Sequence, residues 1–217
     1  MNIVRCGGRG WDSNQFLVKD EKSNRFDMVD AGHGLDFANV LRDVAAVIEP
    51  SRVRNVVVTH EHLDHVNGLP QWKALGATLL ASRGAAHKLR EGRDPTSERF
   101  GARIPQLEVG ILDDGERVQL GAAQFDVLAT PGHSPGSACY WHESSGTLFS
   151  GDTLFADGGI GRFDFPDGDV ATEAQAIMRL SKLQVRMLHC GHGPSVEGED
   201  AVRSVAASLR HVQSCLP

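Results

Sequence analysis

The stretch Val56–His65, VVVTHEHLDH, places three histidines and two acidic residues in six positions directly after a β-branched run. Three neighbouring imidazoles would repel one another whenever they were protonated, and a shared cation removes that repulsion. A helical H-E-x-x-H zinc site would need a histidine at position 64, where Asp64 stands. That motif is therefore excluded, and a metal site of another kind is expected.

The spacing within this stretch indicates two cation positions. His60 and His62 are two residues apart and share a face only where the backbone is extended or turning. Asp64 and His65 are adjacent, so their side chains diverge toward a second position. Two cations a few ångströms apart suit this pattern better than one.

Three more polar clusters follow strand-like runs further along the chain. They are TPGHSPG (130–136), SGDTLF (150–155) and HCGHG (189–193). Each offers an imidazole or a carboxylate beside glycine or proline, where the backbone turns tightly. Because strand ends tend to meet at one edge of a sheet, we expect the four clusters to lie together.

The chain alternates between strand-like and helix-like segments in two groups of similar size. This predicts a layered α/β fold with helices covering a pair of sheets, in one domain over residues 1–217. The polar segment 91–105 has no periodicity and is interpreted as a long loop. Strands are expected over 2–5, 15–19, 26–30, 55–59, 77–81, 117–120, 124–130, 137–142, 146–150 and 185–190, and helices over 37–48, 82–90, 170–178 and 202–212.

Composition narrows the class of protein. The formal net charge of −6 and the isoelectric point near 5.9 argue against a nucleic-acid or anionic-membrane partner. No apolar run approaches the length of a membrane span, the N-terminal residues do not resemble a signal peptide, and the four cysteines form no C-x-x-C pair. A cytoplasmic protein that acts on a small-molecule substrate is expected. The sequence leaves the oligomeric state open.

The four clusters, taken in order, resemble the metallo-β-lactamase-fold hydrolases over nearly the whole chain. The resemblance implies an α/β fold of four layers (αββα), in which two packed mixed sheets are flanked by helices. It also implies a ligand set for two metals. The first metal would be held by His60, His62 and His133, the second by Asp64, His65 and His192, and Asp152 would bridge both.

The implied donors are imidazoles and carboxylates without a thiolate. Such a set admits two divalent ions of zinc, iron or manganese, with zinc expected first. Family members that are true β-lactamases have cysteine or serine in place of Asp152. The aspartate therefore resembles the thioesterase branch of the family.

The stretch SGDTLFADGGIGRFDFPDGD (150–169) resembles glyoxalase II (hydroxyacylglutathione hydrolase) and its short single-domain relatives. This resemblance implies that Arg162 contacts the substrate. The neighbouring tyrosine of glyoxalase II is replaced by Asp164, and only about one helix is expected after HCGHG, in place of the helical domain that completes the glutathione site. Hydrolysis of a small thioester or ester is therefore expected, without a commitment to glutathione.

The implied mechanism uses a hydroxide that bridges the two metals and attacks the substrate carbonyl. Asp64 could also orient the attacking water and accept its proton. Asp30, in MVDAGHG, is expected to hold a ligand histidine through its second ring nitrogen. A serine nucleophile at Ser134 or Ser150 is the weaker hypothesis, because the nearby histidines are better used on metal. The segments 91–105 and 156–168 are expected to shape the pocket.

Three alternatives share parts of this pattern. A persulfide dioxygenase of the same fold would hold one iron through His60, His133 and Asp152. A lactonase would ordinarily use an active-site tyrosine, and the chain has only Tyr140. A non-enzymatic metal module would be a closed four-ligand shell, often rich in cysteine, which this donor set does not match.

Overall fold

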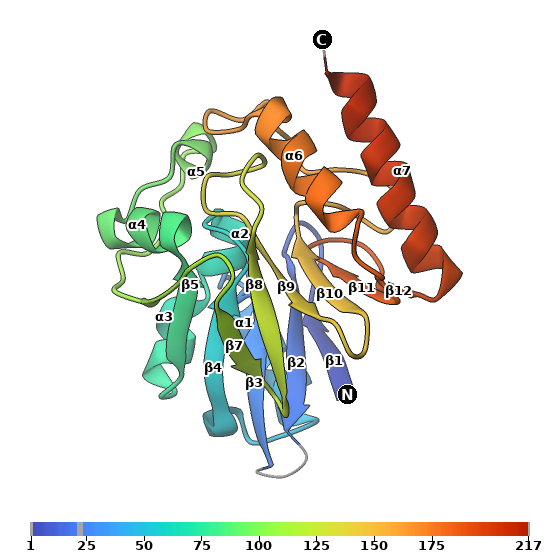
Figure 1. Cartoon of the computed structure of the whole chain (residues 1–217). Helices are drawn as coiled ribbons and strands as arrows, with labels where there is room; N and C mark the ends of the chain where they lie inside the picture. Colours follow the sequence, from blue (N-terminus) through green and yellow to red (C-terminus); the bar gives the residue numbers. More distant parts are fainter. Residues whose placement is uncertain (1, 21–23, 217) are drawn as a thin grey trace.

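The computed structural model describes residues 2–20 and 24–216, and its centre is a pair of six-stranded sheets packed face to face. Figure 1 shows the strands in the middle of the molecule, with α3 and α4 on one side and α6 and α7 on the other. The predicted four layers, helix–sheet–sheet–helix, are confirmed.

The first sheet has the order β1-β2-β3-β4-β5-β6. Strands β1 to β3 are antiparallel, and β3 to β6 are parallel, so the sheet is mixed. Its strands are β1 (Asn2–Gly7), β2 (Asn14–Asp20), β3 (Arg25–Val29), β4 (Val53–Val58), β5 (Thr78–Ser82) and β6 (Gly110–Leu112).

The second sheet has the order β12-β11-β10-β9-β8-β7 and is also mixed. Only β10 and β11 pair in parallel, and the other neighbours are antiparallel. Strands β8, β10 and β11 consequently run in one direction. The strands are β7 (Arg117–Leu120), β8 (Ala123–Ala129), β9 (Ala138–His142), β10 (Thr147–Gly151), β11 (Met187–Cys190) and β12 (Val196–Glu197).

Helices bury their apolar faces on the two outer surfaces of this pair of sheets. Side chains of α1 (Phe37–Ala45), α3 (Leu69–Ala74) and α4 (Arg83–Glu91) belong to the core on the outer face of the first sheet. The helices α6 (Val170–Leu180) and α7 (Glu199–Cys215) cover the second sheet. No helix among the described residues is long and apolar enough to cross a membrane.

The alternation of side chains along each strand decides which core a residue joins. Phe16 and Val18 of β2 point to the second sheet, whereas Leu17 points to the helices. Strand β4 is central and parallel, so Val56, Val57 and Val58 are all fully buried. This run holds β4 rigidly at the point where the histidine stretch begins.

The sequence-based assignment was wrong in several short segments. The region 91–105, interpreted as a loop, contains α5 (Pro95–Arg99), whose N-terminus is capped by the Asp94 carboxylate accepting from Ser97 N at 2.7 Å. The helices α2 (Leu63–Val66) and α3 and the strands β6 and β12 were not expected. They are too short for periodicity to reveal, since each covers less than two turns or no more than three strand residues.

Candidate metal centre

Seven predicted site residues meet at one end of the two sheets. His60 and His62 lie in the loop after β4, and the short helix α2 carries Asp64 and His65. The remaining three lie in loops of the second sheet: His133 after β8, Asp152 after β10 and His192 after β11. Because β8, β10 and β11 run in the same direction, their ends share the edge that faces the end of β4.

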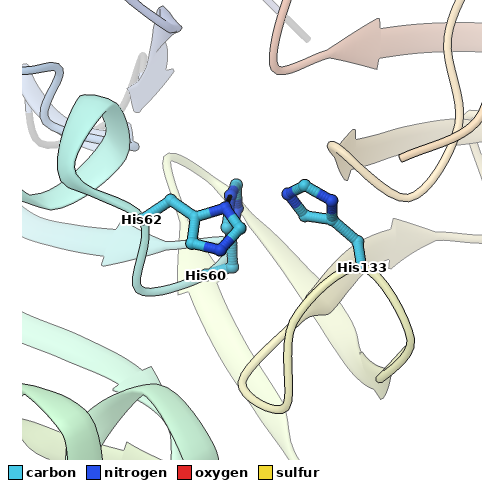
Figure 2. A group of neighbouring side chains, drawn as sticks. All are labelled: His60, His62 and His133. Carbon is cyan, nitrogen blue, oxygen red and sulfur yellow. Dashed lines mark hydrogen bonds between the residues drawn. The ribbon is translucent and has the colours of Figure 1, made fainter. Parts of the chain in front are cut away.

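His60, His62 and His133 form the first group. Figure 2 shows the rings of His60 and His62, from one loop, facing the ring of His133 from the opposite loop. The Nε2 atom of His60 is 3.1 Å from Nδ1 of His62, and one nitrogen from each ring lies within 4.8 Å of the others. That separation allows one cation to contact all three.

Asp64, His65 and His192 form the second group. The Oδ2 atom of Asp64 is 3.1 Å from Nε2 of His192 and 3.7 Å from Nε2 of His65. Asp152 lies between the groups. Its Oδ1 is 3.4 Å from Nε2 of His65, and its Oδ2 is 3.5 Å from Nε2 of His192 and 3.9 Å from Nε2 of His133.

The chemistry of these atoms fits a pair of divalent cations. His65 Nε2, His133 Nε2 and Asp152 Oδ1 are buried without a hydrogen-bond partner. A buried polar atom left unpaired costs free energy, and such atoms are few in folded proteins. Coordination of cations by these atoms would remove that cost. The grouping also places Asp152 where one carboxylate reaches both sets of imidazoles.

Burial tunes the protonation of the centre. Burial together with the neighbouring His133 lowers the pKa of His62 to about 3, and burial also lowers the pKa of His60. For Asp152, burial opposes ionisation, but the surrounding histidines outweigh it and lower the pKa of the carboxyl. Neutral imidazoles and an ionised carboxylate are the forms that bind metals.

His65 differs because it faces three carboxylates. Burial alone would lower its pKa, but Asp30, Asp64 and Asp152 outweigh burial and raise it. Cation binding at His65 Nε2 would therefore displace a proton.

Asp30, which the sequence analysis expected to hold a ligand histidine, contacts the histidine loop. Its backbone is left-handed (φ 63°), and its buried carboxylate accepts from Thr59 N at 2.7 Å and from Thr59 Oγ1 at 2.9 Å. The same carboxylate lies 3.0 Å from Nδ1 of His65. This contact leaves Nε2 of His65 facing the centre. His133 has a comparable contact: its Nδ1 lies 2.9 Å from the backbone carbonyl oxygen of Arg162.

Replacement Asp30→Asn should weaken metal binding about 10- to 100-fold, the range found for partners that orient ligand histidines. An amide presents a donor as well as an acceptor and cannot accept from Thr59 and His65 in the same way. Competition with a chelating dye measures the affinity. Asp113→Asn, at an exposed ion pair with Arg83, is the matched control. An unchanged affinity in Asp30→Asn would show that Asp30 does not orient His65.

Two residues that the sequence analysis did not single out also shape the centre. A Cβ atom on Gly191 would lie 2.1 Å from Asp152 Oδ1 and 2.8 Å from His65 Cε1, so this glycine lets the loop after β11 approach the two ligands. Glu173 of α6 accepts from His133 N at 2.7 Å, and burial raises the pKa of Glu173 to about 8. Gly191 stands inside the motif HCGHG and could have been noticed there, whereas the carboxyl of Glu173, 40 residues from His133, left no local signal.

Other nucleophiles near the centre are engaged elsewhere. The fully buried Ser134 donates to Glu61 at 3.0 Å, and the fully buried Ser150 donates to the carbonyl oxygen of Leu154 at 2.8 Å. Tyr140, also fully buried, donates to the carbonyl oxygen of Val58 at 2.6 Å. Burial raises the pKa of the Cys190 thiol to about 12. These contacts argue against a serine nucleophile, an active-site tyrosine and a thiolate ligand.

A cavity of about 900 Å³ is lined by five of the seven residues: His62, Asp64, His133, Asp152 and His192. Residues of the segment 91–105, among them Thr96 and Phe100, form part of its wall, and Ile160, Arg162 and Phe165 come from the segment 156–168. The prediction that these two segments shape the pocket is confirmed. Arg162 lines this cavity, where a substrate contact was expected.

The fold agrees with what comparison with known proteins shows. Residues 8–197 match the family model of the metallo-beta-lactamase superfamily, so the chain belongs to that superfamily.

Among its relatives, the chain is 35% identical over 202 residues to the "Hydroxyacylglutathione hydrolase GloC" of Haemophilus influenzae, covering 89% of this chain and 91% of the relative. Among solved structures it resembles TTHA1623 in a di-iron-bound form, with a TM-score of 0.72, 28% identity and 97% of each chain covered. It also resembles ETHE1 from Myxococcus xanthus, with a TM-score of 0.72, 20% identity, and 100% and 92% of the two chains covered. At that identity the last match shows the fold alone.

Proposed function

We propose that the protein is a hydrolase of small thioesters or esters that uses two divalent cations, in the manner of glyoxalase II. The observation that carries the proposal is the convergence of five imidazoles and two carboxylates, with buried unpaired atoms, beside one cavity that five of these seven side chains line. Relatives named hydroxyacylglutathione hydrolase support the choice of reaction.

Each residue has a defined task in this proposal. One cation would be held by His60, His62 and His133, the other by Asp64, His65 and His192, and Asp152 would serve both. Two such cations would supply Lewis acidity, which lowers the pKa of a water molecule to about 7 and polarises a carbonyl oxygen.

Two side chains in the cavity can position the attacking water and the substrate. Asp64 is partly exposed to the cavity, with a side chain 20% accessible, and its carboxylate can accept a hydrogen bond from the attacking water. Arg162 projects into the same cavity and can contact the substrate. His60, His62, His65 and His133 are buried, which limits the access of bulk water to the centre.

Metal content and turnover test this proposal together. Protein purified without chelators should carry about two zinc, iron or manganese ions per chain, counted by plasma mass spectrometry. It should also hydrolyse thioesters, with S-lactoylglutathione and a simple neutral thioester as the substrates. Chelation should abolish the activity, and added metal should restore it. Protein with full metal content and no turnover of any thioester or ester would refute the proposal.

A persulfide dioxygenase is the second candidate, because one of the observed ligand groups consists of two histidines and one aspartate: His60, His65 and Asp152. This group differs from the predicted set of His60, His133 and Asp152 in one histidine. About one iron per chain, with oxygen uptake on glutathione persulfide and no hydrolysis, would favour it.

A further inference from the structure

The wall of the cavity beyond the metal centre is mainly apolar. Large apolar side chains from separate loops surround its mouth, and three of them are strongly exposed: Trp11 (55%), Leu35 (85%) and Phe100 (62%). Side chains of this size are rarely left in water together without a ligand or partner to cover them. Their position at the mouth of the cavity indicates that the ligand is what they contact.

These side chains form two groups in the cavity lining. In the first, Phe165 packs edge-on against His62, with ring centroids 5.8 Å apart, and against Phe100, at 5.9 Å. In the second, Trp11 packs against His33 at 4.5 Å. A substrate with its carbonyl at the centre would therefore have apolar surface available from both groups.

The charges in the cavity disfavour an anionic substrate body. Among the described residues that line it, Arg162 is the one lysine or arginine. Its guanidinium donates to both carboxylate oxygens of Asp164, at 2.9 and 2.6 Å, and lies 4.4 Å from the centroid of the Phe165 ring. The charge of Arg162 is thus already offset. A glutathione thioester brings two carboxylates, for which the lining offers no unpaired basic side chain.

We propose that the substrate is a thioester or ester whose larger part is uncharged and apolar, such as a medium-chain or aromatic acyl group, and that this part lies between Phe100, Phe165 and Trp11. The inference rests on the proposed hydrolase function and specifies its substrate class. The cavity volume of about 900 Å³ is large enough for such a ligand.

The central experiment compares kcat/KM of the metal-loaded protein for acetyl, butyryl, hexanoyl and octanoyl thioesters of one uncharged thiol. The value is expected to rise about threefold to fourfold for each methylene added, the change equivalent to about 0.8 kcal/mol per buried CH₂. S-lactoylglutathione should be a poorer substrate than the hexanoyl thioester. A series without any rise, or a preference for S-lactoylglutathione over every neutral thioester, would overturn the inference.

Substitutions locate the apolar part of the substrate. Phe100→Ala should lower kcat/KM for the octanoyl thioester about tenfold, a loss of about 1.4 kcal/mol. It should also weaken the increase of kcat/KM with acyl chain length. Since Phe100 is largely exposed, the variant should fold normally. Val202→Ala is the control, because Val202 is exposed on α7 and lies outside the cavity lining. If kcat/KM rose equally steeply with acyl chain length in Phe100→Ala and Val202→Ala, the apolar part of the substrate would not lie against Phe100.

A further substitution tests whether Asp164 offsets the charge of Arg162. Asp164→Asn removes the partner of Arg162. The freed guanidinium could then pair with a carboxylate of glutathione. The ratio of kcat/KM for S-lactoylglutathione to kcat/KM for the hexanoyl thioester should rise about fivefold, the effect expected from one exposed ion pair. No rise would contradict the role given to the Arg162–Asp164 pair.

A binding measurement separates this inference from the proposed function. Methyl ketones with chains of three to nine carbons cannot be hydrolysed, and Trp11, exposed in the cavity, reports their binding through its fluorescence. Tighter binding with chain length, without turnover of any thioester or ester, would refute the proposed hydrolase and leave an apolar ligand site. Turnover without dependence on chain length would refute the inference and leave the hydrolase.

Discussion

Replacement His60→Ala should lower hydrolysis about 10³-fold or more, which corresponds to roughly 4 kcal/mol of transition-state stabilisation. His60 is central to the site: its ring centroid lies 4.0 Å from that of His65 and 4.9 Å from that of His133. Like His65, it belongs to two of the three candidate ligand groups. Its loss should therefore disturb both proposed cation positions.

The variant should remain folded. Burial and the neighbouring imidazoles lower the pKa of His60, so its ring is neutral in the metal-free protein and its removal breaks no ion pair. Circular dichroism checks the fold, plasma mass spectrometry the metal content and kcat/KM the activity. His87→Ala, at an exposed histidine paired with Glu91 on α4, should behave like the parent protein. Retained activity in His60→Ala would remove the metal mechanism.

Replacement Trp72→Ala should lower the free energy of unfolding by about 3–5 kcal/mol, the usual cost of truncating a buried tryptophan. Trp72 of α3 is fully buried and packs edge-on against Phe37 of α1, with ring centroids 5.3 Å apart. Truncation would leave a cavity between these helices and the first sheet. The helix α3 follows α2, which carries Asp64 and His65, in the chain. The melting temperature of the metal-free protein should fall by roughly 10 °C.

Chemical denaturation of the metal-free protein measures this effect without a contribution from bound cations. Trp11→Ala is the matched control, because that side chain is largely exposed and its removal should change the unfolding free energy by no more than about 0.5 kcal/mol. A loss below about 1 kcal/mol in Trp72→Ala would mean that the helices repack around the void.

The sequence pointed to the seven residues that converge in the structure because their signal is local. His60, His62, Asp64 and His65 stand in one stretch, and the others lie in short motifs next to strand ends. Strand direction then brings these ends to one edge, as β4, β8, β10 and β11 show. The supporting contacts were harder to foresee. Asp30 could be proposed from its place after a strand, whereas Glu173 reaches His133 from a helix 40 residues away.

The shortest helices and strands and the cavity wall left no comparable local signal in the sequence. The helix α5 was missed because one turn shows no periodicity, although its cap, Asp94, and Pro95 were visible in the sequence. Phe100 and Trp11 could equally have been core residues by composition. Only the packing of the loops leaves them exposed beside the centre.

The sequence by itself determined the order of the longer strands and helices, the superfamily and the types of donor atom at the centre. These properties depend on periodic burial along one segment and on short motifs, both of which are local. The tertiary structure alone decided that Glu173 reaches His133, that Asp164 offsets the charge of Arg162, and that the cavity wall is apolar. These properties depend on distances between side chains, which the packing of separate loops sets and no single segment encodes.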